Sequence, residues 1–341
     1  MTNKVFQTVI SCCIALVCCS LSWAQSNVTT KTGSTVRGKI TSMTADNITV
    51  ETRNGNREVS IGDIRNIRLD GEPSWLSSAK TRFNESRYET CYESLTGSQL
   101  EDPVEYIAQE VEYYKSMAAA NIALAGGQVS SKEAGTLLLK FVQQYPSAYG
   151  HYRAVEKFAD LAADTGAFNK ANEYYEKLLA SSSTEIQSRA TVKLGRSKLY
   201  GGESAEAERL FSGIVDGEVS NEMKLEATCF LVQAMAFNNK ADEGIKMIEE
   251  LIDRENSDQT TIFARAYIAL GCCHMQKQDW KAARIAFMHT QLLYQTERDA
   301  YTEALYRLNK VAQQLQDTER SARTRQLLKS RFPNSYWTST L

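Results

Sequence analysis

The chain has 341 residues, of which 39 are basic and 41 acidic, so its formal charge at neutral pH is −2. This balance gives no reason to expect a nucleic acid or an anionic membrane as the partner. Eight cysteines do not suggest a disulfide framework, because four fall within the first 20 residues and the other four contain no C-x-x-C pair. The length suggests two domains or one long repeat array.

The first 24 residues have the pattern of a secretory signal peptide. Lys4 is the only charged residue before an apolar run over 9–21. This run is shorter than the roughly 20 residues that a membrane-spanning helix needs. Ser22 and Ala24 supply the small residues that signal peptidase requires before its cut. We therefore expect cleavage after Ala24 and export to the periplasm or the extracellular space, and no later stretch predicts a membrane span.

Residues 27–70 are predicted to form a small β domain of five short strands. Apolar and polar residues alternate with the period of a strand, as they do over 36–40. Asn54-Gly55 is the favoured pair for a tight hairpin, because both residues tolerate a positive φ. With Ile64 in a one-turn helix before the last strand, this order resembles the SH3-like and Sm-like barrels. A barrel this small is marginal alone, so we expect it to pack against the helices that follow.

From residue 73 to the C-terminus the apolar period changes to 3.6, which predicts helices. The clearest repeat is 267–271 followed by Ala283 and Phe287, which has the spacing of the tetratricopeptide pattern W-x2-L-G-x2-Y…A-x3-F. Gly271 and Ala283 are expected to face each other and let two helices approach closely. The same register places one small residue on each second helix, at Cys91, Ala134, Ala171, Ala207, Gly244, Ala283 and Ser321. Their spacing of about 37 residues predicts six or seven helical hairpins.

The repeats resemble those of tetratricopeptide repeat (TPR) proteins over most of the mature chain. Their endings at 141–147 and 331–335 are similar to those of exported TPR proteins of the bacterial envelope. The expected fold is mainly α: residues 73–341 form an α-solenoid of six or seven TPR-like hairpins, preceded by a small five-stranded β-barrel-like domain. The resemblance implies a non-enzymatic scaffold or adaptor that holds a protein segment in its concave groove.

The first helix of each hairpin is expected to line this groove. Four arginines project there, and a planar guanidinium binds carboxylates in pairs, so the groove suits an acidic, partly apolar segment. The candidate partner-binding residues are Arg153, Arg189, Arg196, Tyr200, Phe237, Arg265, Ile268 and Met275.

No enzyme activity, cofactor or metal site is predicted, since the sequence lacks G-x-S-x-G, phosphate-binding and dinucleotide motifs. The run Cys272-Cys273-His274 looks like a metal site. Consecutive residues of a helix point about 100° apart, however, and cannot close on one zinc ion. Two alternatives to the scaffold stay open. One is a polysaccharide or cell-wall binding module, and the other is an α/α-toroid hydrolase, which would need longer hairpins and an inward carboxylate pair.

Overall fold

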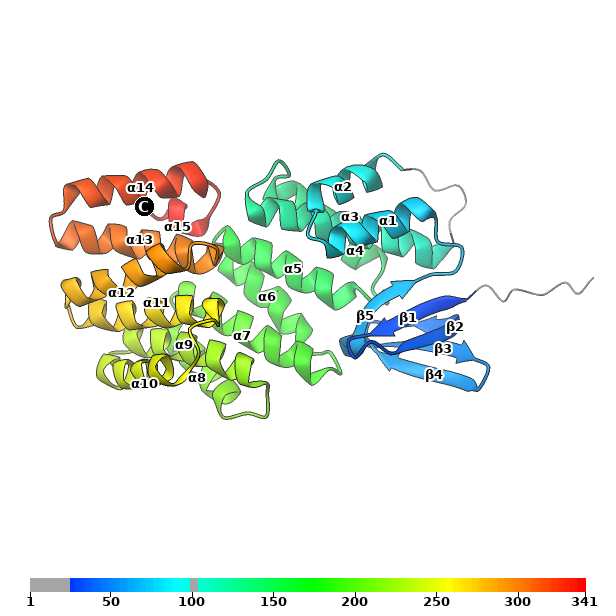
Figure 1. Ribbon diagram of the computed structural model, residues 1–341, viewed down its shortest axis with the longest axis horizontal. Coiled ribbons are helices and arrows are strands. Elements are labelled where there is room, and N and C mark those ends of the chain that lie inside the picture. The colour runs from blue at the N-terminus through cyan, green and yellow to red at the C-terminus, as the bar shows by residue number, and fades with distance from the viewer. Residues whose placement is uncertain (1–24, 99–103) are drawn as a thin grey trace, which may run out of the picture.

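The computed structural model describes residues 25–98 and 104–341, with a β-sheet at one end and helices throughout the rest (Figure 1). The predicted signal peptide therefore lies outside the described residues. The strands are β1 (Ser26–Thr30), β2 (Thr35–Met43), β3 (Asn47–Thr52), β4 (Gly55–Ser60) and β5 (Ile64–Arg68). The helices are α1 (Ser74–Asn84), α2 (Tyr88–Thr96), α3 (Glu105–Ala125), α4 (Ser131–Gln144), α5 (His151–Asp164), α6 (Phe168–Leu178), α7 (Thr184–Tyr200), α8 (Ser204–Val215), α9 (Asn221–Phe237), α10 (Ala241–Arg254), α11 (Thr260–Gln276), α12 (Trp280–Leu293), α13 (Arg298–Gln314), α14 (Thr318–Arg331) and α15 (Tyr336–Ser339).

The five strands form one antiparallel sheet in the order β4-β3-β2-β1-β5. The predicted tight turn joins β3 to β4, and Gly55 adopts a φ of +105° there. A 3-10 turn over Ile61–Asp63 precedes β5, so the one-turn helix is present, but Ile64 begins the last strand instead of lying in that helix. The predicted five strands are confirmed. Because β4 and β5 form the two edges, the sheet is open and is not closed as a barrel.

One face of the sheet shares a continuous hydrophobic core with the first helices of the solenoid. Val28, Ile48 and Ile67 of the strands are fully buried in this core together with Leu76 of α1. Each such side chain stabilises the fold by about 1.5–3 kcal/mol relative to leaving it exposed. The small sheet therefore depends on its helical neighbours, as the sequence predicts.

Helices α1 to α14 pair into seven successive hairpins in the described part of the chain, and the short α15 follows. All seven predicted small residues lie on second helices, and only Ser321 is more than slightly exposed. The predicted repeat register is thus confirmed. The expected partner of Gly271 is wrong, however: a Cβ there would lie 2.4 Å from Cε1 of Phe287. The close approach therefore accommodates the Phe287 ring rather than Ala283.

The superhelix turns far enough for its last hairpin to touch its early ones, and Figure 1 shows α13 beside α5. Arg298 at the start of α13 donates a 3.0 Å hydrogen bond to the carbonyl of Ala125 at the end of α3. Arg196 of α7 pairs with Asp299 of α13 at 3.1 Å. The inner side therefore holds a partly open cavity instead of a long open groove. Among the described helices, none is both long and apolar enough to span a bilayer.

Candidate functional site

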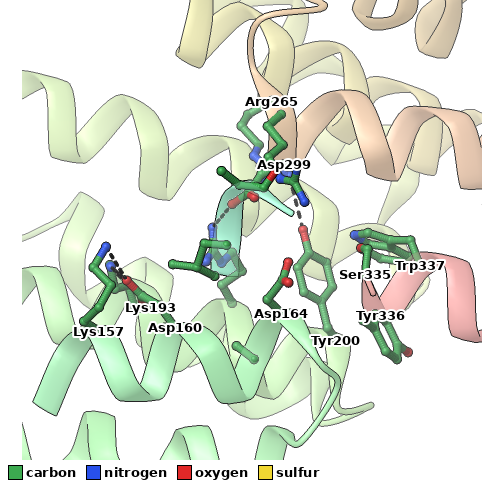
Figure 2. A pocket seen from close by; sticks show the side chains of 15 residues that line it. Lys157, Asp160, Asp164, Lys193, Tyr200, Arg265, Asp299, Ser335, Tyr336 and Trp337 are labelled. Atoms are coloured by element: carbon green, nitrogen blue, oxygen red, sulfur yellow. Dashed lines mark hydrogen bonds and ion pairs between the residues drawn. The ribbon is translucent and has the colours of Figure 1, made fainter. Parts of the chain in front are cut away.

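Helices α3, α5, α7, α11 and α13 surround a cavity of about 410 Å³, and α15 closes one side of it (Figure 2). This volume falls within the range of about 300–1,000 Å³ that is typical of ligand sites. The cavity lining includes five cationic and three acidic side chains, namely Lys157, Lys193, Arg196, Arg265, Arg298, Asp160, Asp164 and Asp299. The lining therefore has an excess of positive charge when all three carboxyls are ionised.

Asp160 of α5 is an anchored carboxylate. Its two oxygens each lie 2.8 Å from Nζ of Lys193, and the Tyr175 hydroxyl donates a further hydrogen bond at 2.8 Å. Burial alone would raise the pKa of Asp160, but the charges of Lys193 and Lys157 outweigh it and lower the pKa to about 2. This side chain is ionised at neutral pH and fastens α5 to α7.

Asp164 lies one turn further along α5, on the same side of the helix as Asp160. Burial and the neighbouring charge of Asp299 raise its pKa to about 6, although Arg298 and Arg196 act in the opposite direction. The charge of the cavity therefore changes by one unit near pH 6. Two carboxyls four residues apart thus differ widely in acidity, because only Asp160 is tied to a lysine.

Glu303 of α13 forms a fully buried hub beside the cavity. Its carboxylate accepts hydrogen bonds from Tyr200 and Gln233, both at 2.6 Å. Arg265 and Arg307 donate to it at 3.0 and 3.1 Å. These four donors come from α7, α9, α11 and α13, so one carboxylate links four inner helices. Buried charges are stable only when paired and hydrogen-bonded, and this arrangement meets that condition.

Three predicted partner-binding residues, Arg196, Tyr200 and Arg265, are brought together in the cavity wall. The two arginines already form ion pairs, because Arg196 and Arg265 lie 3.1 and 3.7 Å from Asp299. The bare basic wall that was expected is therefore a network of ion pairs. A bound carboxylate would have to join this network or displace part of it.

Two other predicted arginines serve contacts outside the cavity. Arg153 donates to the carbonyl of Ile64 at 3.0 Å and so ties α5 to the sheet. Arg189 pairs with Glu156 at 2.9 Å, between α7 and α5.

The predicted apolar contacts separate in the same way. Ile268 is fully buried in the core between hairpins, so its side chain cannot contact a partner. Met275 packs against the same core cluster. Phe237 is 45% exposed, and the Arg307 guanidinium lies 5.3 Å from its ring centre.

The carboxylates of the cavity and hub were not predicted from the sequence. They lie on first helices at spacings of four, as in Asp160 with Asp164 and Asp299 with Glu303. That periodicity was a usable signal, because residues four apart share one face of a helix. It cannot identify their partners, since Arg196 and Asp299 are 103 residues apart in sequence.

The cysteine run contributes to packing. Cys272 and Cys273 are buried in the core, and burial raises the pKa of each thiol to about 12, so both are protonated at neutral pH. Over the described ranges, no group of three or more His, Cys, Asp and Glu side chains is placed to hold a metal ion.

Comparison with known proteins identifies the fold. No family model and no curated protein matches the chain. Among solved structures, the chain is similar to a Rap protein complexed with competence and sporulation factor, with a TM-score of 0.55 at 10% identity over 78% of this chain and 77% of that one. The chain has a TPR-like helical repeat fold. Further matches are a TPR protein from Parabacteroides merdae (TM-score 0.46, 12% identity, 68% and 83% covered) and PilF of Pseudomonas aeruginosa (TM-score 0.40, 16% identity, 68% and 97% covered).

Proposed function

We propose that this protein is an exported, non-catalytic scaffold of the bacterial cell envelope that holds a short segment of a partner protein in its inner cavity. The observation that carries the proposal is the cavity itself, which lies where the inner helices converge and combines charged walls with the rings of Tyr200, Tyr336 and Trp337. Aromatic and arginine side chains are the residues most enriched at protein contacts. Support for export comes from the N-terminal sequence pattern.

The segment that fits best is acidic with an apolar neighbour. Lys157 and Arg298 are the cavity cations that carboxylates hold least closely: Nζ of Lys157 lies 3.7 Å from Asp160, and Arg298 bonds a backbone carbonyl. Both can turn toward a bound carboxylate without leaving a buried charge unpaired. The excess positive charge of the lining also attracts an acidic segment.

Catalysis is the weaker candidate, although one observation favours it. The pKa values of Asp160 and Asp164 are moved in opposite directions, as in acid–base pairs of hydrolases. Asp160 is nevertheless occupied by Lys193 and Tyr175, which leaves it poorly placed to act as base or nucleophile. We therefore assign these carboxyls to cavity architecture and binding.

A pull-down from envelope extract tests the proposal. The double variant Lys157→Gln/Arg298→Gln removes the two available cations and should lower partner recovery about tenfold or more, which corresponds to at least 1.4 kcal/mol. The matched control is Lys281→Gln/Arg284→Gln, which removes the same charges from α12 on the outer layer. Circular dichroism melts check that both variants fold.

Equal recovery by the two folded variants would contradict the proposal. Recovery that survives protease but is lost after glycan digestion would favour the polysaccharide-binding alternative.

The export proposal has its own test. Mass spectrometry of the native protein should find an N-terminus at Gln25, and an intact Met1 would contradict it.

A further inference from the structure

The C-terminal segment 335–341 runs back from α14 across the inner side of the superhelix. Ser335, Tyr336 and Trp337 form one wall of the cavity, and Figure 2 shows them beside Tyr200. The segment contains the four-residue helix α15, none of whose residues is fully buried. The segment therefore packs on the surface of the solenoid and is not part of a hairpin.

The site beneath it, which we call the aromatic cradle, consists of Gly166, Phe168, Tyr200, Tyr306 and Arg307. These residues come from four places in the chain: the α5–α6 turn, the start of α6, the end of α7 and the middle of α13. Each contact is with one of two adjacent rings of the C-terminal segment.

The first ring is Tyr336. Its centre lies 4.8 Å from that of Phe168, in an edge-to-face arrangement with an interplanar angle of 79°. Gly166 has a φ of +81°, and a Cβ at this position would lie 2.7 Å from Cδ2 of Tyr336. The backbone of the α5–α6 turn is thus shaped to receive an aromatic ring at this point.

The second ring is Trp337. Its centre lies 5.0 Å from Tyr200 and 5.1 Å from Tyr306, and the guanidinium of Arg307 lies 5.4 Å from it. These distances are those of favourable aromatic and cation–π contacts. Arg307 is itself held by Glu303, so the platform under the indole is fixed before anything binds.

Among the described residues, the polar side chains of the segment form hydrogen bonds only with nearby residues of the C-terminal region. The hydroxyls of Thr338, Ser339 and Thr340 donate to carbonyl groups between residues 328 and 337. Leu341 packs against the apolar cluster of Tyr301, Leu305, Leu328 and Phe332, so attachment to the cradle itself rests on the two rings. Such an attachment can be exchanged for an equivalent pair of rings without leaving a buried polar group unsatisfied.

We propose that the aromatic cradle is a peptide-binding site for segments with two adjacent aromatic residues, and that the chain's own Tyr336-Trp337 occupies it until a partner segment displaces it. The incoming rings then take the place of Tyr336 and Trp337 in the cavity wall, and the residues that flank them lie near the cavity cations. The physiological ligand rests on the proposed scaffold function, whereas the site itself can be tested with this chain alone.

The test uses the full chain with Tyr336→Ala/Trp337→Ala, which vacates the cradle, and a fluorescein-labelled peptide of residues 333–341. Fluorescence anisotropy should show saturable binding to this variant. Binding to the wild type should be at least about tenfold weaker, because its tethered segment competes at an effective concentration in the millimolar range. A peptide with alanine at both aromatic positions should not bind. Equal binding to wild type and variant, or no binding to the folded variant, would overturn the proposal.

A second measurement does not depend on that variant. In wild-type protein labelled with 5-fluorotryptophan, the Trp337 fluorine resonance is assigned by its loss in Trp337→Phe. Excess unlabelled peptide should move this resonance toward its position in the free peptide, and a resonance that does not move would overturn the proposal. A negative result would leave the pull-down of the previous subsection unaffected, so the cradle and the scaffold function fail separately.

Discussion

Lys80 and Glu303 are each almost completely buried, yet the charges around them are reversed. Lys80 of α1 contacts two carboxylates, Glu72 at 2.6 Å and Glu110. It also donates to the carbonyl of Ile67 in β5 at 3.1 Å, so this cluster joins the sheet to the first hairpins. Glu303 contacts two guanidiniums and joins the inner helices of later hairpins.

The difference lies in which ions can be neutralised. Burial raises the pKa of Glu110, although Lys80 acts to lower it, so the cluster at the sheet has a group that can take up a proton. Around Glu303, the two arginines stay charged at any accessible pH. Besides Glu303, aromatic rings stabilise these arginines: the guanidinium of Arg265 lies 5.2 Å from the ring centre of Phe230. The stability of the junction with the sheet should therefore respond to pH.

The largest expected effect comes from Glu303→Gln. Removing the carboxylate charge leaves Arg307 without its carboxylate partner and Arg265 with only the more distant Asp299, 3.7 Å away, and should lower the free energy of unfolding by about 3–5 kcal/mol. Urea denaturation at pH 7.5 measures this loss. Glu319→Gln on the exposed side of α14 is the control and should change stability by less than about 0.5 kcal/mol. Similar midpoints for both variants would show that the hub is not a structural centre.

Lys80→Met should cost about 3 kcal/mol at pH 7.5, because two carboxylates are left without their cation. A carboxyl whose folded-state pKa is raised destabilises the fold when ionised, and this penalty disappears below its unfolded pKa. The loss should therefore shrink as the pH is lowered, because Glu110 takes up a proton more readily than an ordinary glutamate. Urea denaturation at a series of pH values measures this change. A loss that stays constant as the pH is lowered would show that Glu110 does not relieve the unpaired charge.

A buried apolar residue serves as a reference for the two charged clusters, because its contribution to stability should not depend on pH. Ala283 is fully buried between the helices of its hairpin, so Ala283→Leu should cost about 1–3 kcal/mol by overpacking, with no dependence on pH. Lys281→Leu, on the exposed side of the same helix, should cost far less. Equal urea midpoints for the two variants would mean that the repeat register is wrong.

The smallest effect should be a gain. The pKa of Asp164 is raised from 3.8 to about 6, so its ionisation destabilises the folded chain above pH 6 and does not do so below about pH 4. Two pKa units correspond to about 3 kcal/mol, and partial exposure reduces the expected gain for Asp164→Asn at pH 7.5 to about 1–2 kcal/mol. Thermal melts at pH 7.5 and 5 should show the gain diminishing at the lower pH. A destabilised variant at pH 7.5 would show that Asp164 is paired.

The helical hairpins could be predicted because their determinants are local. Small residues such as Ala171 and Ala207 recur at a constant interval, and each is fully buried where two helices cross. The strand count was accessible for the same reason. Whether the sheet closes into a barrel depends on pairing between β4 and β5. The alternation of apolar and polar residues along one strand does not show which strands pair.

The cavity was less accessible from sequence. Its ion pairs join hairpins that meet only because small rotations between repeats accumulate along the superhelix. Projection of one repeat correctly gathered Arg196, Tyr200 and Arg265 on the inner side. It could not show that Asp299 would lie opposite them, or that the C-terminal rings would close the cavity.

Photo-crosslinking in cells tests most directly whether the inner cavity is where a partner binds. A photoreactive phenylalanine derivative would replace Ala163, which lines the cavity, or Ala205, which is exposed on α8, a second helix. The proposed function predicts a discrete protein adduct from position 163 and none from position 205. Adducts from position 205 alone, or the same adducts from both positions, would contradict it.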